Sequence, residues 1–183
     1  LEQSSKQLQQ WSTIIASLLR IHTDSADPDR KQMIATFEHL AAILELDLGV
    51  ESIVLTSSNN RFLAMHGLEP GSSTWTTLAQ VSRQVATTEN PASLLDCSET
   101  CLQYAIAPIL GIGGTLVLGL SLADIVLDFQ QVSGTDLGLV VGQTRAVSKN
   151  GDGERWLQQW GVKVAALSNM HTNIEILRAA TRK

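Results

Sequence analysis

The chain has 183 residues, of which 44% are hydrophobic, so it can bury a core as one domain or as one domain with part of another. Its 13 basic and 18 acidic residues give a net charge of -5, and the scattered Lys and Arg argue against a nucleic-acid partner. An aromatic content of 4% argues against stacking platforms for bases or sugars. The histidines lie far apart and make no metal-ligand spacing, so we expect no metal and no cofactor.

Two amphipathic helices, or one long helix with a break over 23–27, are predicted at the start of the chain. The first has an apolar stripe at helical spacing, which consists of Leu8, Trp11, Ile15 and Leu18. The second begins at Asp27 and Pro28, a capping residue before a first-turn proline, and ends at Gly49. Its stripe consists of Met33, Phe37, Leu40 and Leu44. Because the opening segment also contains charged residues, it does not resemble a signal peptide, and a segment taken from a longer protein would explain this start.

The pattern changes to short β-rich runs from Val50 onward. Val50–Leu55 and Arg61–Met65 flank a turn-forming tetrad, so they predict a hairpin. A short helix follows over Thr76–Thr87, with Ser73 or Thr74 as its cap. Its inward face is predicted to consist of Leu78, Val81 and Val85.

Three further strands are predicted, over Ala92–Cys97, Cys101–Leu110 and Thr115–Leu120. The uncharged stretch 102–123 has about the length of a membrane span, but a proline and three glycines divide it into two short runs. We therefore interpret it as a hairpin between buried strands. The segment Ser121–Asp124 then has a capping-box pattern, and the helix that it opens ends at Gly134. The side chains predicted to face inward on this helix are Ile125, Phe129 and Val132.

Two strands, a short helix and three strands are typical of a PAS-like antiparallel five-stranded sheet, and the N-terminal helices would cover one face. The predicted fold class is therefore α+β. A GAF-like regulatory domain shares most of these elements and remains the alternative. A last strand over 136–141, a loop over 148–153, a strand over 162–167 and a helix over 174–180 follow. We expect a helical segment over 1–47, a sensor core over 48–147, and a linker with the start of a second, membrane-proximal unit over 148–183.

Three segments resemble the periplasmic double-Cache sensors that precede diguanylate cyclase, phosphodiesterase or histidine kinase modules. They are Cys97–Pro108, Leu118–Asp124 and Ser133–Val140. The resemblance implies a cyclic di-GMP or two-component receptor with a transmembrane helix on each side of a periplasmic domain. It also implies a small-molecule ligand in a PAS-like pocket, but not which ligand. The stripe of the first helix could pack against a sheet or against a second copy of itself, so we expect a homodimer in the membrane-anchored receptor.

Five residues are candidates for contacts with the ligand: Arg61, His66, Trp75, Arg83 and Tyr104. Arg83 could hold a carboxylate in a bidentate pair, although a solvated helix face is the favoured explanation of this residue. A buried Tyr104 hydroxyl needs a partner, which a ligand or the backbone could supply. Trp75 could form a pocket wall or a lid over the core.

Cys97 and Cys101 enclose three residues between strand-like flanks. Fully extended, four residue steps span about 13 Å, whereas a disulfide needs Cα atoms about 4.4 to 6.8 Å apart, so a tight turn is required. With the periplasmic interpretation we expect a disulfide. The alternatives are two free thiols in a cytosolic protein and, less well supported by the spacing, a redox-active pair.

Catalysis by this segment is not expected. The glycines at 111, 113 and 114 do not form a dinucleotide fingerprint, because the third glycine of that motif would fall at Leu116. The sequence has neither a G-x-S-x-G elbow nor a phosphate-binding loop. A sensor domain, a cytosolic GAF-like regulatory domain and a thiol redox enzyme remain as three classes of function.

Overall fold

The structure is a computed structural model of the chain and describes residues 2–21, 30–57, 59, 61–98, 100–111, 113–142 and 155–180. The predicted helix start at Asp27 and Pro28 and the predicted loop over 148–153 lie outside these residues. The chain forms two compact units. The first comprises Leu1–Ser98 and Leu102–Leu120, and the second Glu99–Cys101 and Ser121–Lys183.

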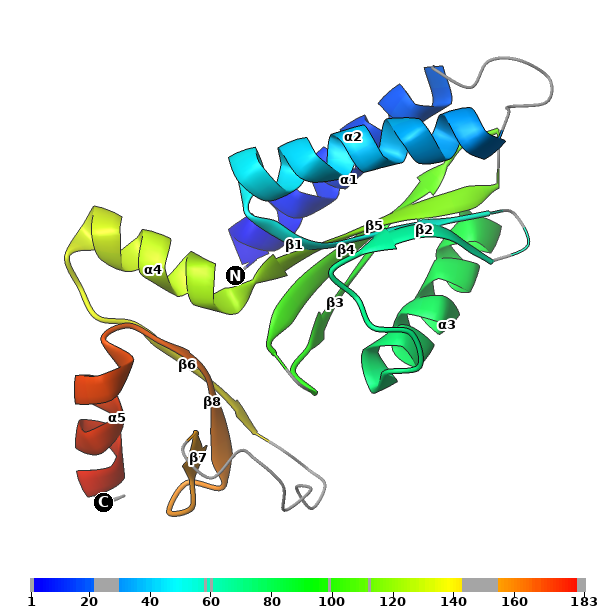
Figure 1. The fold of residues 1–183 in the computed structure, drawn as a ribbon. Coiled ribbons are helices and arrows are strands. Elements are labelled where there is room, and N and C mark those ends of the chain that lie inside the picture. The colour runs from blue at the N-terminus through cyan, green and yellow to red at the C-terminus, as the bar shows by residue number, and fades with distance from the viewer. Residues whose placement is uncertain are drawn as a thin grey trace. The chain divides into compact units, whose positions relative to one another are not determined.

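The first unit is built on a five-stranded antiparallel sheet with the strand order β2-β1-β5-β4-β3 (Figure 1). The strands are β1 (Val50–Thr56), β2 (Phe62–His66), β3 (Ala92–Asp96), β4 (Leu102–Ile109) and β5 (Gly114–Ser121). Each of the five agrees with its predicted range to within one residue at either end. The predicted α+β class with a PAS-like sheet is confirmed.

Helices α1 (Glu2–Ile21) and α2 (Arg30–Leu48) cover one face of this sheet, and α3 (Ser73–Thr88) covers the other (Figure 1). On α1 the prediction of Leu18 as an inward residue is wrong, because its side chain is 44% exposed whereas Leu19 is 1% exposed. The buried face of α1 also includes Ser12, a polar residue that the predicted apolar stripe leaves out. Residues 8, 12, 15 and 19 follow the helical repeat, so Leu19 and not Leu18 continues the buried face.

A β-bulge in β1 decides which face its side chains occupy. Val50 pairs with Leu120 and Ser52 pairs with Gly119, so Glu51 has no residue opposite it. After the bulge, Ile53 and Leu55 belong to the core under α1 and α2, whereas Val54 belongs to the core under α3. Because side chains alternate along a strand, Ser52 lies on the same face as Val54.

Helix α3 begins at Ser72, whose Oγ accepts a hydrogen bond from the Trp75 backbone N–H at 3.2 Å. The prediction of Ser73 or Thr74 as the cap is therefore wrong by one or two residues. The helix ends at Glu89, which has a left-handed conformation with φ 54° and donates its backbone N–H to the Val85 carbonyl at 2.8 Å.

The second unit contains α4 (Leu122–Ser133), β6 (Gly138–Gly142), β7 (Trp156–Leu157), β8 (Val162–Leu167) and α5 (Met170–Ala179), with the sheet order β6-β8-β7. The predicted capping residue Ser121 and the predicted end at Gly134 are confirmed for α4. The prediction that Phe129 and Val132 face inward is wrong, because they are 46% and 90% exposed. The buried face is set by Leu122 and Val126, which are one turn apart.

Asp136 connects several parts of the second unit. Its Oδ1 accepts hydrogen bonds from Gln130 Nε2 at 2.8 Å, Asn169 Nδ2 at 2.9 Å and Ser168 Oγ at 3.0 Å. Side-chain hydrogen bonding by Asn173, and next by Ser168, holds the pKa of Asp136 below its ordinary value of 3.8. The carboxylate thus joins the end of α4 to the start of α5.

Among the residues that the structure describes, no helix is both long enough and apolar enough to cross a membrane.

Candidate functional site

The layer between α3 and the sheet is a mainly apolar core. Its buried residues are Val54, Leu78, Val85, Leu102, Tyr104, Ile106 and Val117. Partly buried side chains, including those of Phe62 and Leu94, extend the layer at its margins. We call this region the α3 layer. In such surroundings a polar atom without a hydrogen-bond partner has a measurable cost, so any such atom needs an explanation.

Two buried hydroxyls without a partner enter the α3 layer from opposite sides. Ser82 lies on the buried face of α3, between Leu78 and Val85, and is 0% exposed. Ser52 lies on β1, is also 0% exposed, and sits on the α3 face of the sheet because of the bulge. Within the described part of the chain, neither Oγ has a hydrogen-bond partner. Because buried polar groups in folded proteins are normally satisfied, these two hydroxyls are the candidate hydrogen-bonding groups for a further molecule.

Tyr104 forms the floor of the same region. It is 1% exposed and lies on β4, and its ring occupies the space over Gly119 of β5. A Cβ on Gly119 would lie 2.7 Å from the Tyr104 Cε1 atom and 3.1 Å from the Cβ of Ser52. The missing side chain at position 119 therefore leaves room for the ring beside the Ser52 hydroxyl.

Of the five residues predicted to contact a ligand, the structure brings Trp75 and Tyr104 to the α3 side of the sheet. Trp75 lies in the first turn of α3 and is half-buried. Its ring stacks against Phe62 of β2, with centroids 3.6 Å apart and an interplanar angle of 33°. This aromatic pair therefore closes the layer where β2 meets the start of α3.

The three basic candidates do not lie with Trp75 and Tyr104 on the α3 side of the sheet. Arg83 is on the exposed side of α3, and Arg61 is exposed at the start of β2. The Nε2 atom of His66 lies 3.0 Å from Glu45 Oε2 of α2, so this histidine faces the helix pair on the other side of the sheet. Within the described ranges, no three His, Cys, Asp or Glu side chains gather in a way that could hold a metal ion.

The predicted disulfide between Cys97 and Cys101 is confirmed. Beside it, the Oδ1 atom of Asp96 accepts the Ser98 backbone N–H at 2.9 Å, which shapes the loop after β3. The Ser98 and Thr74 hydroxyl oxygens lie 3.0 Å apart and share a hydrogen bond. The loop next to the disulfide is thus connected to the first turn of α3.

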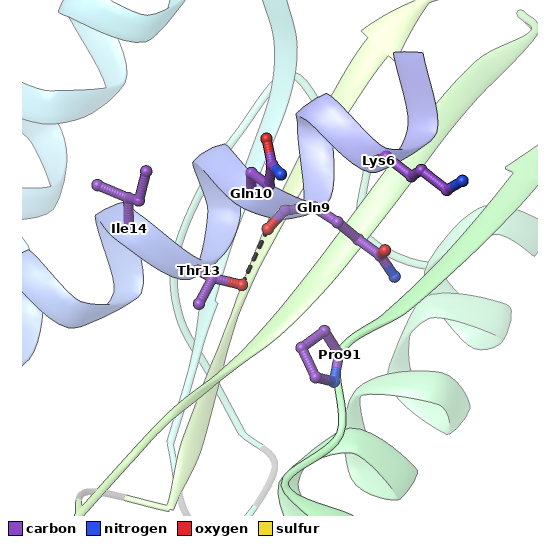
Figure 2. A pocket seen from close by; sticks show the side chains of 6 residues that line it. All are labelled: Lys6, Gln9, Gln10, Thr13, Ile14 and Pro91. Atoms are coloured by element: carbon purple, nitrogen blue, oxygen red, sulfur yellow. Dashed lines mark hydrogen bonds between the residues drawn. The ribbon is translucent and has the colours of Figure 1, made fainter. Parts of the chain in front are cut away.

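An open groove of about 480 Å³ lies beside α1, on the other face of the sheet from α3 (Figure 2). Its lining consists of Lys6, Gln9, Gln10, Thr13 and Ile14 of α1 with Pro91, which precedes β3. The Thr13 hydroxyl donates to the Gln9 carbonyl at 2.9 Å, so it is already satisfied within the helix. Because none of the lining residues contributes a buried atom without a partner, we prefer the α3 layer as the site.

Ser52, Ser82 and Gly119 were not among the residues singled out from the sequence. A signal existed for Ser82, because it lies four residues after Leu78 and three before Val85 on the same helical stripe. For Ser52 the signal was weaker, since its direction depends on a bulge that the sequence does not reveal.

The comparisons with known proteins agree with this architecture. A family model described as the double sensory domain of two-component sensor kinases, dCache_3, matches residues 1–183. A search of curated proteins finds no match to the chain. This match covers every residue of the chain. It confirms the resemblance to double-Cache sensors that three sequence segments predict. The chain therefore belongs to the double sensory domain family of two-component sensor kinases.

Proposed function

We propose that this chain is the extracytoplasmic ligand-sensing domain of a transmembrane receptor, and that a small molecule binds in the α3 layer. The observation that carries the proposal is the pair of buried hydroxyls without partners, Ser52 and Ser82. Membership in a sensory-domain family supports a sensing role rather than a catalytic one. Any cyclase, phosphodiesterase or kinase activity would belong to an output module of the parent receptor.

The disulfide supports an extracytoplasmic location, because disulfides persist in oxidising compartments such as the periplasm. The test is to alkylate the protein directly from cells and measure its intact mass before and after reduction. We expect no alkylation before reduction and two alkylated thiols afterwards. Two alkylated thiols in the unreduced sample would argue for a reducing compartment.

Strand β4 offers a route from the ligand to α1. Tyr104 faces the α3 layer, whereas its neighbour Ala105 belongs to the core under α1 and α2. Helix α1 packs directly against β4. A ligand that shifts Tyr104 would therefore also shift the surface on which α1 rests, by no more than its differential affinity for the two states.

We propose further that α1 pairs with a second copy of itself in a homodimer. Ile14 is 57% exposed on the side of α1 away from the sheet. With Ile14→Cys we expect a crosslinked dimer under mild oxidation, because a parallel pair brings the same residue of each copy together. Gln80→Cys, exposed on α3, is the matched control and should stay monomeric. Equal crosslinking of both variants would contradict pairing through α1.

Ligand binding is tested by thermal-shift screening of the whole chain with small carboxylates, amines, amino acids, amides and alcohols. A hit should bind more weakly to Ser82→Ala and Tyr104→Phe than to the unaltered protein. Arg83→Ala should bind it equally well, because Arg83 is exposed on the outer side of α3. A hit that needs Arg83 but neither Ser82 nor Tyr104 would place the site elsewhere.

A further inference from the structure

We infer that the ligand of the α3 layer is electrically neutral, with an apolar body and hydrogen-bonding groups that meet Ser52 and Ser82. This inference rests on the proposed function, since it concerns the chemistry of the same site. The two hydroxyls enter the layer from the sheet and from the helix, and neither has a partner among the described residues. A serine hydroxyl both donates and accepts, so amide, hydroxyl and carbonyl groups all suit it.

Charged ligands are disfavoured by what surrounds the two hydroxyls. Among the described residues of the first unit, no Asp, Glu, Lys, Arg or His is buried. Arg83, the basic residue nearest in sequence to Ser82, is exposed on the outer side of its helix. An ionised carboxylate or ammonium placed in the layer would lose its hydration and gain no counter-charge. Hydrogen bonds to neutral hydroxyls do not compensate for that loss.

The apolar side chains around the two hydroxyls indicate the character of the rest of the molecule. Leu78 and Val85 face the layer from α3, and Val117 faces it from β5. The ring of Tyr104 lies beside Ser52, over the position where Gly119 has no side chain. A compact aliphatic or aromatic body with one or two neutral polar groups complements this surface, whereas a zwitterionic amino acid does not.

The test uses matched probes that differ only in charge: butyramide and 1-butanol against butyrate and n-butylamine, with benzamide against benzoate. Binding is followed by chemical-shift changes in the backbone amides of α3 and β5 in the NMR spectrum of the whole chain, which detects weak complexes. We expect the neutral probes to shift these signals and their charged counterparts not to do so. Ser52→Ala and Ser82→Ala should each weaken neutral-probe binding by about tenfold, which corresponds to one hydrogen bond.

Ser12→Ala is the matched control. Ser12 is also 0% exposed, but it lies on α1 and donates its hydroxyl to the Gln9 carbonyl at 2.9 Å. This variant should bind the probes as the unaltered protein does. Ser82→Ala should not lower the melting temperature of the free protein, because it removes a hydroxyl that has no partner. A marked loss of stability in Ser82→Ala would show a structural role for the hydroxyl and overturn the inference.

Two results separate the inference from the proposed function. If the charged probes bind as well as the neutral ones and depend on Ser82 and Ser52, the sensing site stands and the inference of a neutral ligand is wrong. If no probe shifts the α3 and β5 signals, or if the serine variants bind unchanged, both the inference and the assigned site are wrong.

Discussion

Tyr104 and Gly119 fit together so closely that a Cβ on Gly119 would lie 2.7 Å from the Cε1 atom of the tyrosine ring. We predict that Gly119→Ala lowers the free energy of unfolding by about 1 to 3 kcal/mol, because the added Cβ would collide with the tyrosine ring and force it from its preferred position. Chemical denaturation followed by circular dichroism measures this change.

Gly142→Ala is the control for that substitution, since a Cβ at position 142 would meet no atom of the described residues within 4 Å. It should leave stability nearly unchanged. The double variant Gly119→Ala with Tyr104→Leu should cost less than the sum of the two single changes, because the shorter side chain removes the collision. Strict additivity would show that the ring is not the cause.

Thr56 and Thr115 form a buried polar pair between β1 and β5. Their hydroxyl oxygens lie 2.8 Å apart, and the Thr115 backbone N–H donates to Thr56 Oγ1 at 3.0 Å. Thr56→Val leaves two buried groups of Thr115 unsatisfied, so we expect a loss of about 1 to 3 kcal/mol in the free energy of unfolding. Thr56→Ser keeps the hydroxyl and should lose clearly less. Equal losses in the two variants would assign the effect to packing instead.

The disulfide closes a very short loop, so its contribution to stability is modest. In the chain-entropy model, a loop of this size stabilises the fold by about 2 kcal/mol. Replacing both cysteines by serine should lower the free energy of unfolding by that amount, as should reductant acting on the unaltered protein. An unchanged melting temperature after both treatments would show that the disulfide does not stabilise the fold.

Asp136 makes the stability of the second unit depend on pH. A carboxyl whose pKa is lower in the folded state stabilises the fold above its unfolded pKa, and loses this contribution as pH falls through the folded value. The hydrogen bonds from Asn173 and Ser168 lower the pKa of Asp136 below 3.8. At neutral pH, Asp136→Asn should therefore melt at a lower temperature than the unaltered protein, and this difference should shrink as the pH drops below 3.8.

Asp128→Asn is the control for that experiment, because Asp128 is exposed on α4 and has no side-chain partner among the described residues. Its melting temperature should follow that of the unaltered protein at every pH. A direct measurement of the Asp136 carboxyl titration by carbon NMR completes the test. A midpoint at or above 3.8 would contradict the assignment.

Much of the fold could be predicted from the sequence, because strand runs and turn residues occur together. Strand β8 was predicted over the range Val162–Leu167 that the structure shows. Strand β7, Trp156–Leu157, was not predicted, since two residues are too few to show a periodic pattern. The inward residues of α4 were misassigned for a related reason: its apolar residues occur on more than one side of the helix, so periodicity did not single out the buried face.

The candidate site was harder to predict than the fold. Each residue turns a helix by about 100°, so Arg83 is exposed although its neighbour Ser82 is fully buried. Whether a serine hydroxyl finds a partner depends on residues distant in sequence, which no local pattern reveals. The burial of Tyr104 could be expected from the sequence, because most of its neighbours in the predicted strand are apolar.

The measurement that tests the central claim most directly is a crystal structure of the chain with the best neutral hit from the screen. We predict density for the hit between α3 and the sheet, with polar atoms within hydrogen-bonding distance of Ser52 Oγ and Ser82 Oγ and its apolar body against the ring of Tyr104. Density for the hit in the groove between α1 and Pro91, with both serine hydroxyls still without a partner or bonded only to water, would contradict the account.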